Sequence, residues 1–415
     1  MEYITVSQAA EKWGISTRRV QILCGSDRIK GVVRFGPNWM IPADAERPED
    51  GRGKSGGKKQ TELTSVDMPL PRKTPFLYMS DLYTIPGSSA EVVEGLAYNP
   101  EAQALFEAEI AYSRGDIDKV YESASFLLNK HSGFYAIISA GMLLALCAIW
   151  KGDLEMWRRA KLHVSEARIK SEYDREIITL AITAVDSMLY DIKDFPEWFK
   201  IGCFEPLPKD ALPAAKVYYA KYLYAAAHAL ATGEIRLDGV KGLTLMDMLP
   251  CTIEPMISQA KADETVIAEM YLRMTCAVIY YHSNKKEQAL RHLDRAISLA
   301  LPDRLYGFIA EYCRTLYALI EMRMMQIDEN AWREVERLYK IYNAGWSKLH
   351  SSVSGRQIIS KLSEKYREVA RLAAYKMSTA EIAKRVNMSE SGVKQAIKSI
   401  SEKSGLDRDQ FAAII

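Results

Sequence analysis

The sequence has few cysteines and no cysteine pair at the spacing of a metal site. The six cysteines of the chain are Cys24, Cys147, Cys203, Cys251, Cys276 and Cys313. Because no CxxC motif and no nearby histidine pair accompanies them, we expect no metal cage and no bound metal. Cysteines scattered in this way are typical of small buried side chains in a reducing compartment.

A long apolar segment is also missing. The first residues, Met1–Ile4, contain no basic stretch followed by an apolar run, so we expect no secretion signal. The longest apolar stretch, near Ile137–Trp150, is too short and mixed to span a bilayer. We therefore expect a cytoplasmic protein that does not contact a membrane.

The residues of an active site are not found together either. The histidines are His131, His163, His228, His282, His292 and His350, and each stands among ordinary helix residues. No serine or cysteine lies in the context of a nucleophile elbow, and the acidic residues follow helix surfaces. We expect a protein that is not an enzyme and that needs no cofactor.

The small net charge of +2 hides a division along the chain. Residues 1–60 carry 11 Lys+Arg against 7 Asp+Glu, residues 356–415 carry 12 against 7, and the rest carries 32 against 39. A chain of 415 residues is expected to fold as two to four units. Basic ends around an acidic middle indicate two nucleic-acid-binding ends on an interaction or sensor body.

The segment Ser378–Lys398 has the pattern of two short helices joined by a tight turn. Ser378 and Ser389 each occupy an N-cap position, and Glu381 follows Ser378 at capping-box spacing. The apolar positions that form two helical stripes are Ile382, Ala383, Val386, Met388, Val393, Ile397 and Ile400. The pattern predicts a helix-turn-helix whose second helix has a free polar face.

This segment resembles the LuxR-type helix-turn-helix domain of bacterial transcription regulators, from about Leu362 to Ile415. The matching residues are Leu362, Glu364, Glu368, Val369, Leu372, Met377, Ser378, Glu381, Ile382, Ala383, Ser389, Glu390, Ser391, Val393, Lys394, Lys403, Gly405, Leu406 and Arg408. Three positions depart from the family pattern: Lys376 replaces a usual Gly, Gly392 a usual Thr, and Ala396 a usual His.

The resemblance implies a DNA-binding domain over residues 356–415. Its recognition helix would present Ser391, Lys394, Gln395 and Lys398 to double-stranded DNA. Glutamine can pair with adenine through two hydrogen bonds, and lysine can donate to guanine or to phosphates. The alternative is that Lys394 and Lys398 form only a solvated face. A glycine inside a helix costs about 1 kcal/mol, so Gly392, together with Ala396, suggests weak binding by this domain alone.

A second helix-turn-helix pattern covers residues 3–42. Thr5 and Gln8 have capping-box spacing, Gly14 ends the first helix, and Ser16 precedes a second one. After them, β-prone segments surround Gly36-Pro37-Asn38, which indicates a hairpin. A hairpin directly behind a recognition helix is the order of a winged helix.

This arrangement resembles the excisionase and MerR-like winged helix-turn-helix domains, over residues 1–47. The resemblance implies that Thr17, Arg18, Arg19 and Gln21 face the major groove. Arg34 or Asn38 on the wing would then meet the DNA backbone or the minor groove. The alternative is that Arg18 and Arg19 only make a small domain soluble.

Residues 48–75 are rich in Pro, Gly, Lys and Glu and have almost no periodic apolar positions. We expect a flexible linker, with a reach on the order of 30 Å. Gly53-Lys54-Ser55 imitates a phosphate-binding loop. The motif would require glycine where Pro48 stands, and it lacks the flanking strand and helix, so we reject nucleotide binding there.

Residues 76–350 show a succession of helical patterns. Three helix pairs enclose turns at Arg114–Asp116, Lys151–Asp153 and Ser283–Lys285. The spacing of the first two turns is close to the period of tetratricopeptide (TPR) repeats, so we expect a TPR-like helical body. Stacked repeats form a groove that can hold a peptide, a protein or a small-molecule effector. The tyrosines of Tyr218–Tyr224 either line this groove or pack between helices.

The sequence thus predicts a mainly α protein with a winged helix-turn-helix, a TPR-like body and a C-terminal helix-turn-helix. We expect a transcription regulator that binds double-stranded DNA at both ends and senses an effector or partner through its body. The alternatives are an excisionase-like architectural factor for mobile DNA, or a TPR scaffold whose end domains bind proteins. The sequence leaves a homodimer open.

Overall fold

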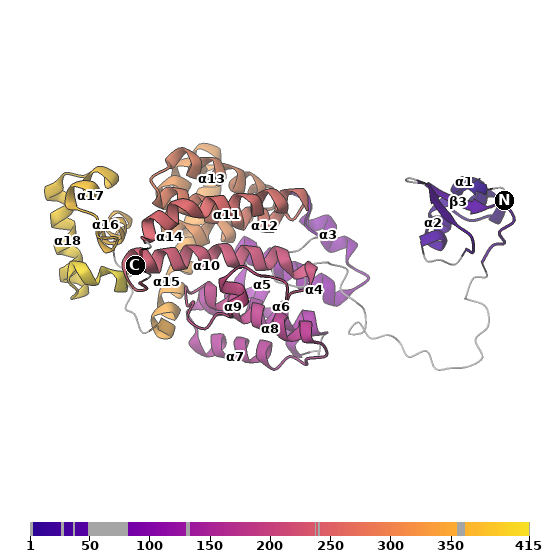
Figure 1. The fold of residues 1–415 in the computed structure, drawn as a ribbon, viewed down its shortest axis with the longest axis horizontal. Coiled ribbons are helices and arrows are strands. Elements are labelled where there is room, and N and C mark those ends of the chain that lie inside the picture. Colours follow the sequence, from indigo (N-terminus) through magenta and orange to yellow (C-terminus); the bar gives the residue numbers. More distant parts are fainter. Residues whose placement is uncertain are drawn as a thin grey trace. The chain divides into compact units, whose positions relative to one another are not determined.

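A computed structural model of the chain describes residues 3–25, 29–35, 38–48, 82–129, 133–236, 238–239, 241–354 and 362–414. Helices dominate these residues, so the prediction of a mainly α fold is confirmed (Figure 1). The chain divides into two compact units, Met1–Glu62 and Leu63–Ile415. The predicted linker lies outside the described residues after Pro48, and so does Gly53-Lys54-Ser55.

The N-terminal unit combines two helices with a small antiparallel sheet. Its elements are β1 (Tyr3–Thr5), α1 (Val6–Trp13), α2 (Thr17–Gly25), β2 (Val33–Phe35) and β3 (Asn38–Pro42). The strand order is β1-β3-β2, with Tyr3 opposite Pro42 and Val33 opposite Met40. The sequence pattern did not predict β1. The small core consists of Ala9, Ala10, Trp13, Val20, Leu23, Cys24, Ile29 and Ile41.

The start and end of α1 follow local signals in the sequence. Thr5 and Gln8 form the predicted capping box, in which the Gln8 amide donates to Thr5 Oγ1 over 3.3 Å and the Thr5 amide donates to Gln8 Oε1 over 2.9 Å. Gly14 ends the helix in the left-handed conformation, with φ at 64°. The strands on either side of the predicted hairpin pair with each other, whereas Gly36 and Pro37 lie outside the described residues.

The body of the second unit is a set of helices that pack mostly as consecutive pairs. The helices are α3 (Ser89–Gly95), α4 (Pro100–Arg114), α5 (Ile117–Asn129), α6 (Phe134–Lys151), α7 (Leu154–Ser165), α8 (Glu172–Ser187), α9 (Glu197–Lys200), η2 (Lys209–Ala211), α10 (Leu212–Thr232), α11 (Gly242–Ala262), α12 (Val266–His282), α13 (Lys286–Ala300), η3 (Leu301–Asp303), α14 (Tyr306–Ile327) and α15 (Glu329–Ser354). The three predicted helix-turn-helix pairs are confirmed as α4–α5, α6–α7 and α12–α13, with left-handed Gly115, Gly152 and Asn284 in their turns.

The late helices of the body return to the early ones, because α15 packs against α6 and α14 against α4. Glycines allow this close approach. A Cβ atom on Gly345 would lie 2.1 Å from the carbonyl oxygen of Trp150, and one on Gly307 would lie 2.5 Å from the amide of Gly115. In an open solenoid each repeat contacts only its neighbours, so these contacts between late and early helices go beyond the stacking that the repeat pattern predicted.

Helix α6 is longer than the predicted apolar stretch. By length and composition it could cross a membrane, which corrects the expectation that this segment is too short. However, 78% of it is buried inside the body, where α5, α7 and α15 pack against it. A core position in a helical body accounts for its apolar composition.

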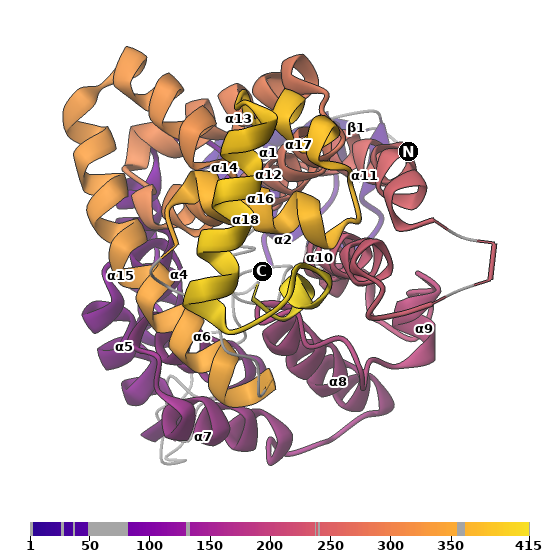
Figure 2. The ribbon, with the colours of Figure 1, turned by 90° about the vertical axis from the view of Figure 1, so that its left-hand side faces the viewer.

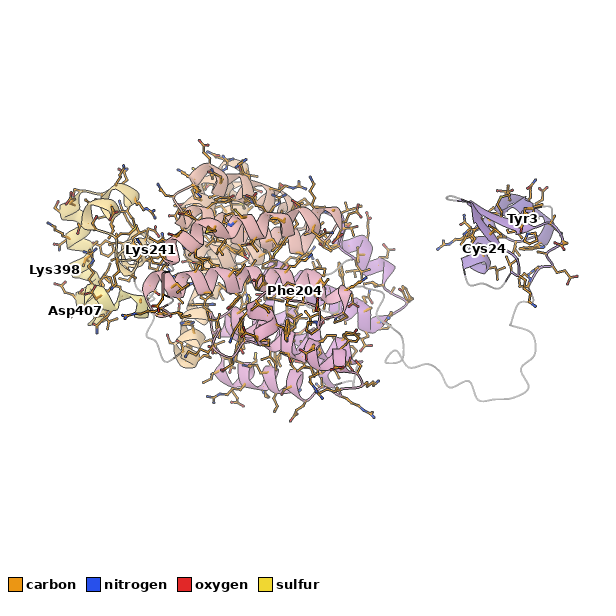
Figure 3. All side chains as sticks on the ribbon, viewed as in Figure 1. Tyr3, Cys24, Phe204, Lys241, Lys398 and Asp407 are labelled. Carbon is orange, nitrogen blue, oxygen red and sulfur yellow. The ribbon has the colours of Figure 1, made fainter. Side chains whose placement is uncertain are left out.

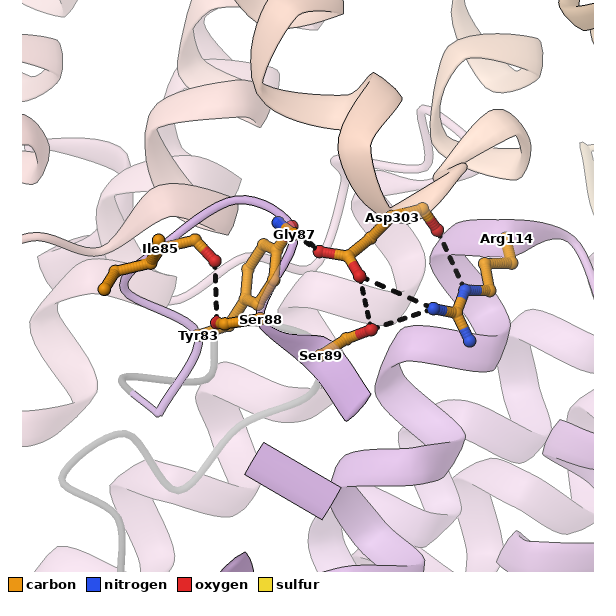
Figure 4. Close-up of polar contacts among 7 residues, drawn as sticks. All are labelled: Tyr83, Ile85, Gly87, Ser88, Ser89, Arg114 and Asp303. Atoms are coloured by element: carbon orange, nitrogen blue, oxygen red, sulfur yellow. Dashed lines mark hydrogen bonds and ion pairs between the residues drawn. The ribbon is translucent and has the colours of Figure 1, made fainter. Parts of the chain in front are cut away.

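A buried carboxylate fastens the start of the body to η3 (Figure 4). Asp303 accepts hydrogen bonds from the Tyr83 hydroxyl at 2.5 Å, the Gly87 amide at 2.6 Å and the Ser89 hydroxyl at 2.5 Å. Arg114 Nε donates to the Asp303 carbonyl oxygen over 2.9 Å. Burial alone would raise the pKa of Asp303, but these hydrogen bonds outweigh it and hold that pKa below its usual value.

The C-terminal helices have a core of their own and lie at one end of the body (Figures 1 and 2). They are α16 (Glu364–Ala374), α17 (Thr379–Val386), α18 (Glu390–Ser404) and the 3-10 helix η4 (Arg408–Ile414). Their core consists of Leu362, Val369, Ala370, Leu372, Ala373, Ala374, Ile382, Ala383, Val393, Ala396, Ile400 and Phe411. Helices α17 and α18 both pack on α16, which completes a three-helix domain.

Candidate nucleic-acid interface

The turn between α17 and α18 is specified by caps on both helices. The Ser378 amide donates to Glu381 Oε2 over 2.7 Å, and the Glu381 amide donates to Ser378 Oγ over 3.3 Å, as predicted for a capping box. Asn387 ends α17 in the left-handed conformation, with φ at 51°. Ser389 Oγ then accepts from the amide of Gly392 at 3.1 Å. The predicted helix-turn-helix is therefore confirmed.

The candidate DNA-reading residues of α18 lie together on its exposed side. They are Ser391, Lys394, Gln395 and Lys398, and all four are exposed. The opposite side of the helix packs into the core through Val393, Ala396 and Ile400. Figure 3 shows Lys398 on the side of α18 that points away from the body.

The lysines of this surface are only weakly engaged within the protein. Lys398 Nζ lies 3.9 Å from Glu402 Oε1, and the two side chains are 70% and 65% exposed. An ion pair this open contributes little, so a phosphate can compete for the ammonium group. The exposed face of α18 can therefore present two cations and one amide to a partner without a large free-energy cost from broken ion pairs.

The three departures from the LuxR pattern have separate structural meanings. Lys376 adopts the left-handed conformation with φ at 61°, which explains why glycine is usual there. Gly392 lies in the first turn of α18, where its amide is held by the Ser389 cap. Ala396 is fully buried, so this replacement changes the core and leaves the exposed face of the helix unaltered.

The inner side of the same domain docks on the body through residues that the sequence analysis missed. Arg385 Nη1 donates to the His282 carbonyl oxygen over 3.1 Å, and Arg367 Nη2 donates to the Tyr339 hydroxyl over 2.9 Å. The Tyr375 ring lies 5.5 Å from the ring of His228. Arg367, Arg371 and Tyr375 follow one another at four-residue spacing, which is the signal that could have placed them on one inward face.

In the N-terminal unit, some of the residues predicted to contact DNA lie together. Thr17, Arg18 and Gln21 are exposed along α2, while Val20 between them is buried. Arg19 lies in α2 and Arg34 in β2, but their side chains lie outside the described part of the structure. The exposed side of α2 thus carries at least one cation and two neutral hydrogen-bonding groups.

Metal ligands do not gather in the described part of the chain. Among these residues no group of three or more His, Cys, Asp or Glu side chains is placed to hold a metal ion. Burial raises the pKa of Cys147 and of Cys276 to about 12, so both thiols stay protonated at neutral pH. The absence of a cofactor remains a prediction.

Comparison with known families identifies one similarity, and it falls on the C-terminal helices. The family described as Sigma-70, region 4 matches residues 356–399, which include α16, α17 and most of α18. No curated protein and no solved structure matches the chain. The similarity supports a C-terminal helix-turn-helix of the DNA-binding type and a function related to transcription.

Proposed function

We propose that the protein is a transcription regulator that binds double-stranded DNA through α18 and controls this contact through its helical body. The observation that carries the proposal is the exposed face of Lys394, Gln395 and Lys398. This face belongs to a helix-turn-helix similar to Sigma-70, region 4, and the docking of the inner side on the body leaves it open. Lysine contacts to phosphate would supply affinity, and Gln395 could read adenine.

The finer features of the proposal rest on the sequence. A LuxR-type character of the C-terminal domain is supported by the matching residues, among them the Ser378–Glu381 capping box. Binding by a second, winged helix-turn-helix end is supported by the basic N-terminal region and by the exposed Thr17, Arg18 and Gln21 on α2. Two linked DNA-binding modules raise the overall affinity through effective concentration.

A sensing role of the body is supported by how it holds α16. Helices α10, α12 and α15 contact the inward face of the C-terminal domain through the His228 ring, the His282 carbonyl oxygen and the Tyr339 hydroxyl. A change in the body at this point would alter the contacts that position the helix-turn-helix. Such differential contacts are the physical requirement for control of one site by another.

The test is DNA binding by the full chain carrying Lys394→Ala and Lys398→Ala together. If both lysines neutralise phosphates, the slope of log affinity against log salt falls by about 1.8. Fluorescence anisotropy with labelled genomic fragments at several salt concentrations measures this slope. The matched control is Lys340→Ala, since Lys340 is also an exposed helix lysine in a single ion pair, but on α15.

An unchanged salt slope in the double variant would remove α18 as the DNA contact. No DNA binding by the wild-type chain, on random or genomic fragments, would instead favour a scaffold whose end domains bind proteins. Binding that is equally tight on every sequence would favour an architectural factor.

A further inference from the structure

A cavity of about 280 Å³ lies between the body and α16. Its volume is near the lower end of the range for small-molecule sites. The lining comes from α10, α12, α14 and α15, from the segment Leu189–Lys193, from Glu234 and Ile235 after α10, and from Arg367, Glu368 and Arg371 of α16. A smaller cavity of about 60 Å³ shares Tyr190, Tyr224, Arg314 and Thr315 with it and is otherwise lined by residues of the body. The closed arrangement of the helices thus encloses a space next to the DNA-binding domain.

Aromatic rings form one wall of the cavity. Tyr190 and Tyr224 meet edge to face with ring centroids 6.0 Å apart, and the Tyr224 ring lies 5.6 Å from that of His282. Tyr190 has a left-handed backbone, with φ at 56°. Residue Tyr190 is 45% exposed, yet burial raises the pKa of its hydroxyl, and the residue lines the cavity.

The lining also carries cations without carboxylate partners. Arg314 stacks on Trp346, 3.8 Å from the ring centroid, and donates to Asn343 Oδ1 over 3.1 Å. Arg367 donates to the Tyr339 hydroxyl. Among the described residues, no carboxylate forms an ion pair with either guanidinium. Burial and then the charge of Arg367 lower the pKa of Arg314, so the two groups are close enough to repel each other.

A third cation, Lys221, extends this pattern into the smaller cavity. Its Nζ lies 2.9 Å from Met188 Sδ and 5.0 Å from the centroid of the Tyr271 ring, and no described carboxylate pairs with it. Glu311 lines the same cavity, accepts a hydrogen bond from Tyr112, and its charge favours the ammonium of Lys221. Burial nevertheless lowers the pKa of Lys221, so Glu311 does not fully compensate the cost of burying this cation. An anion from outside the chain would compensate that cost.

Three buried polar atoms in the lining also lack a hydrogen-bond partner among the described residues. They are Nε2 of His282, Nε of Arg367 and Nη1 of Arg371, and residues His282 and Arg371 are 1% and 8% exposed. Arg371 is already neutralised by Glu368, so its free Nη1 is a spare donor beside the two unpaired arginines. The arginine nitrogens are donors, and buried donors are normally satisfied, so they point to a missing acceptor in the cavity.

We propose that this cavity is the effector site, and that its effector is a small organic anion whose carboxylate or phosphate group pairs with Arg314 and Arg367 and whose apolar part packs against Tyr190 and Tyr224. Arg314 belongs to α14 of the body and Arg367 to α16 of the DNA-binding domain. The bound anion therefore bridges the two and removes their mutual repulsion. The regulatory role of the anion rests on the proposed function, whereas the existence of the anion site is independent of it.

The first test is isothermal titration calorimetry of the full chain with three probes of similar ring size. Benzoate offers a carboxylate, phenyl phosphate offers a phosphate, and benzyl alcohol offers no charge. We expect at least one of the two anions to bind about tenfold or more tightly than benzyl alcohol. The preferred anion distinguishes a carboxylate effector from a phosphate effector. No heat from either anion, or equal affinity for benzyl alcohol, would overturn the site.

Single substitutions then locate the binding. Arg314→Met and Arg367→Met keep the length of the side chain but remove its charge, so each should weaken the preferred anion about tenfold. The control is Arg333→Met, because Arg333 is an exposed arginine of α15 outside the cavity. Having two variants on different helices keeps the test valid if one of them fails to fold. Unchanged affinity in both would overturn the assignment.

DNA binding is measured separately on the same samples. The Lys394→Ala, Lys398→Ala variant should lose DNA affinity and keep the probe affinity of the wild type. Wild-type protein that binds the probe but no DNA would contradict the proposed function and leave the anion site intact. Wild-type protein that binds DNA but no anion would contradict the anion site and leave the proposed function intact. DNA affinity that stays constant as the probe saturates would overturn the regulatory role.

Discussion

The outer and inner faces of the C-terminal helices carry similar basic side chains in opposite surroundings. On the outer face, Lys394 and Lys398 are exposed, and Lys398 has only a loose pair with Glu402. On the inner face, Arg371 is 8% exposed and pairs with Glu368, while Arg367 contacts the body.

This difference shows that positive charge alone does not identify a DNA contact. Residues 356–415 hold 12 basic side chains, which suggested a nucleic-acid-binding end as a whole. The fold separates these side chains into two sets. The outer lysines are exposed and accessible to phosphates, whereas the inner arginines lie at the interface with the body and line the cavity. The outer set should therefore govern salt-dependent DNA binding, and the inner set should govern stability and ligand binding.

The largest expected difference between the faces is in stability. Arg371→Ala removes a buried guanidinium and leaves the Glu368 carboxylate without its partner, which should cost the domain about 3 kcal/mol. Hydrogen exchange of the amides in α16–α18, followed by mass spectrometry, measures this local free energy without assuming that the whole chain unfolds in one step.

Lys398→Ala is the matched control for this experiment, because it also breaks an ion pair with a glutamate one helical turn away. Its partners are exposed, so the effect should stay within about 0.5 kcal/mol. Equal losses in the two variants would show that the inner pair is no more important to the domain than the outer one.

The second prediction concerns the pH dependence of anion binding in the cavity beside the inner face. Burial lowers the pKa of Lys221 to about 8 from its usual 10.5. Below pH 8 the ammonium is charged and attracts an anion in the adjoining cavity; above it the attraction is lost. Benzoate affinity should therefore stay level up to about pH 7 and fall roughly threefold between pH 7 and 9. Benzoate itself keeps its charge throughout, so calorimetry at several pH values isolates the protein group.

Lys221→Met provides the control, since it retains the apolar stem and removes the titrating group. We expect weaker binding with a flat pH profile over the same range. If the benzoate affinity of this variant fell as steeply with pH as that of the wild type, the titrating group would be another residue of the cavity and Lys221 would have no role in the site.

Local signals in the sequence account for the parts of the fold that were predicted. The capping boxes of Thr5 with Gln8 and of Ser378 with Glu381 depend on residues three positions apart, so they can be read directly from the sequence. The helix pairs around Gly115 and Gly152 were found for the same reason. The exposed set on α18 followed from helical periodicity, although its contact with DNA remains a prediction.

The parts that escaped prediction depend on contacts between distant segments. The periodic pattern of α15 gives no sign that Gly345 meets the backbone of α6, or that α16 covers the end of the body. Closure of the helices created the cavity, so its lining could not be read from any one helix. The available signal was a cation close in sequence to tyrosines, as with Lys221 in α10 and Arg314 in α14.

The smallest effect concerns Lys376, in the turn after α16 that joins the inner helix to the outer pair. Its left-handed backbone, with φ at 61°, costs a residue with a Cβ atom about 1–2 kcal/mol, which glycine would avoid. Glycine also loses more conformational entropy on folding and gives up the exposed pair of Lys376 with Asp409. We therefore expect Lys376→Gly to stabilise the domain by only about 0.5 kcal/mol.

Hydrogen exchange of α16–α18 can resolve this change when Lys376→Ala is measured beside it. Alanine removes the same ion pair but keeps the Cβ atom, so it should bring no gain. A gain with glycine alone assigns the strain to the backbone of the turn. Gains with both residues would mean that the lysine side chain, through its charge, is what destabilises the junction between the two faces.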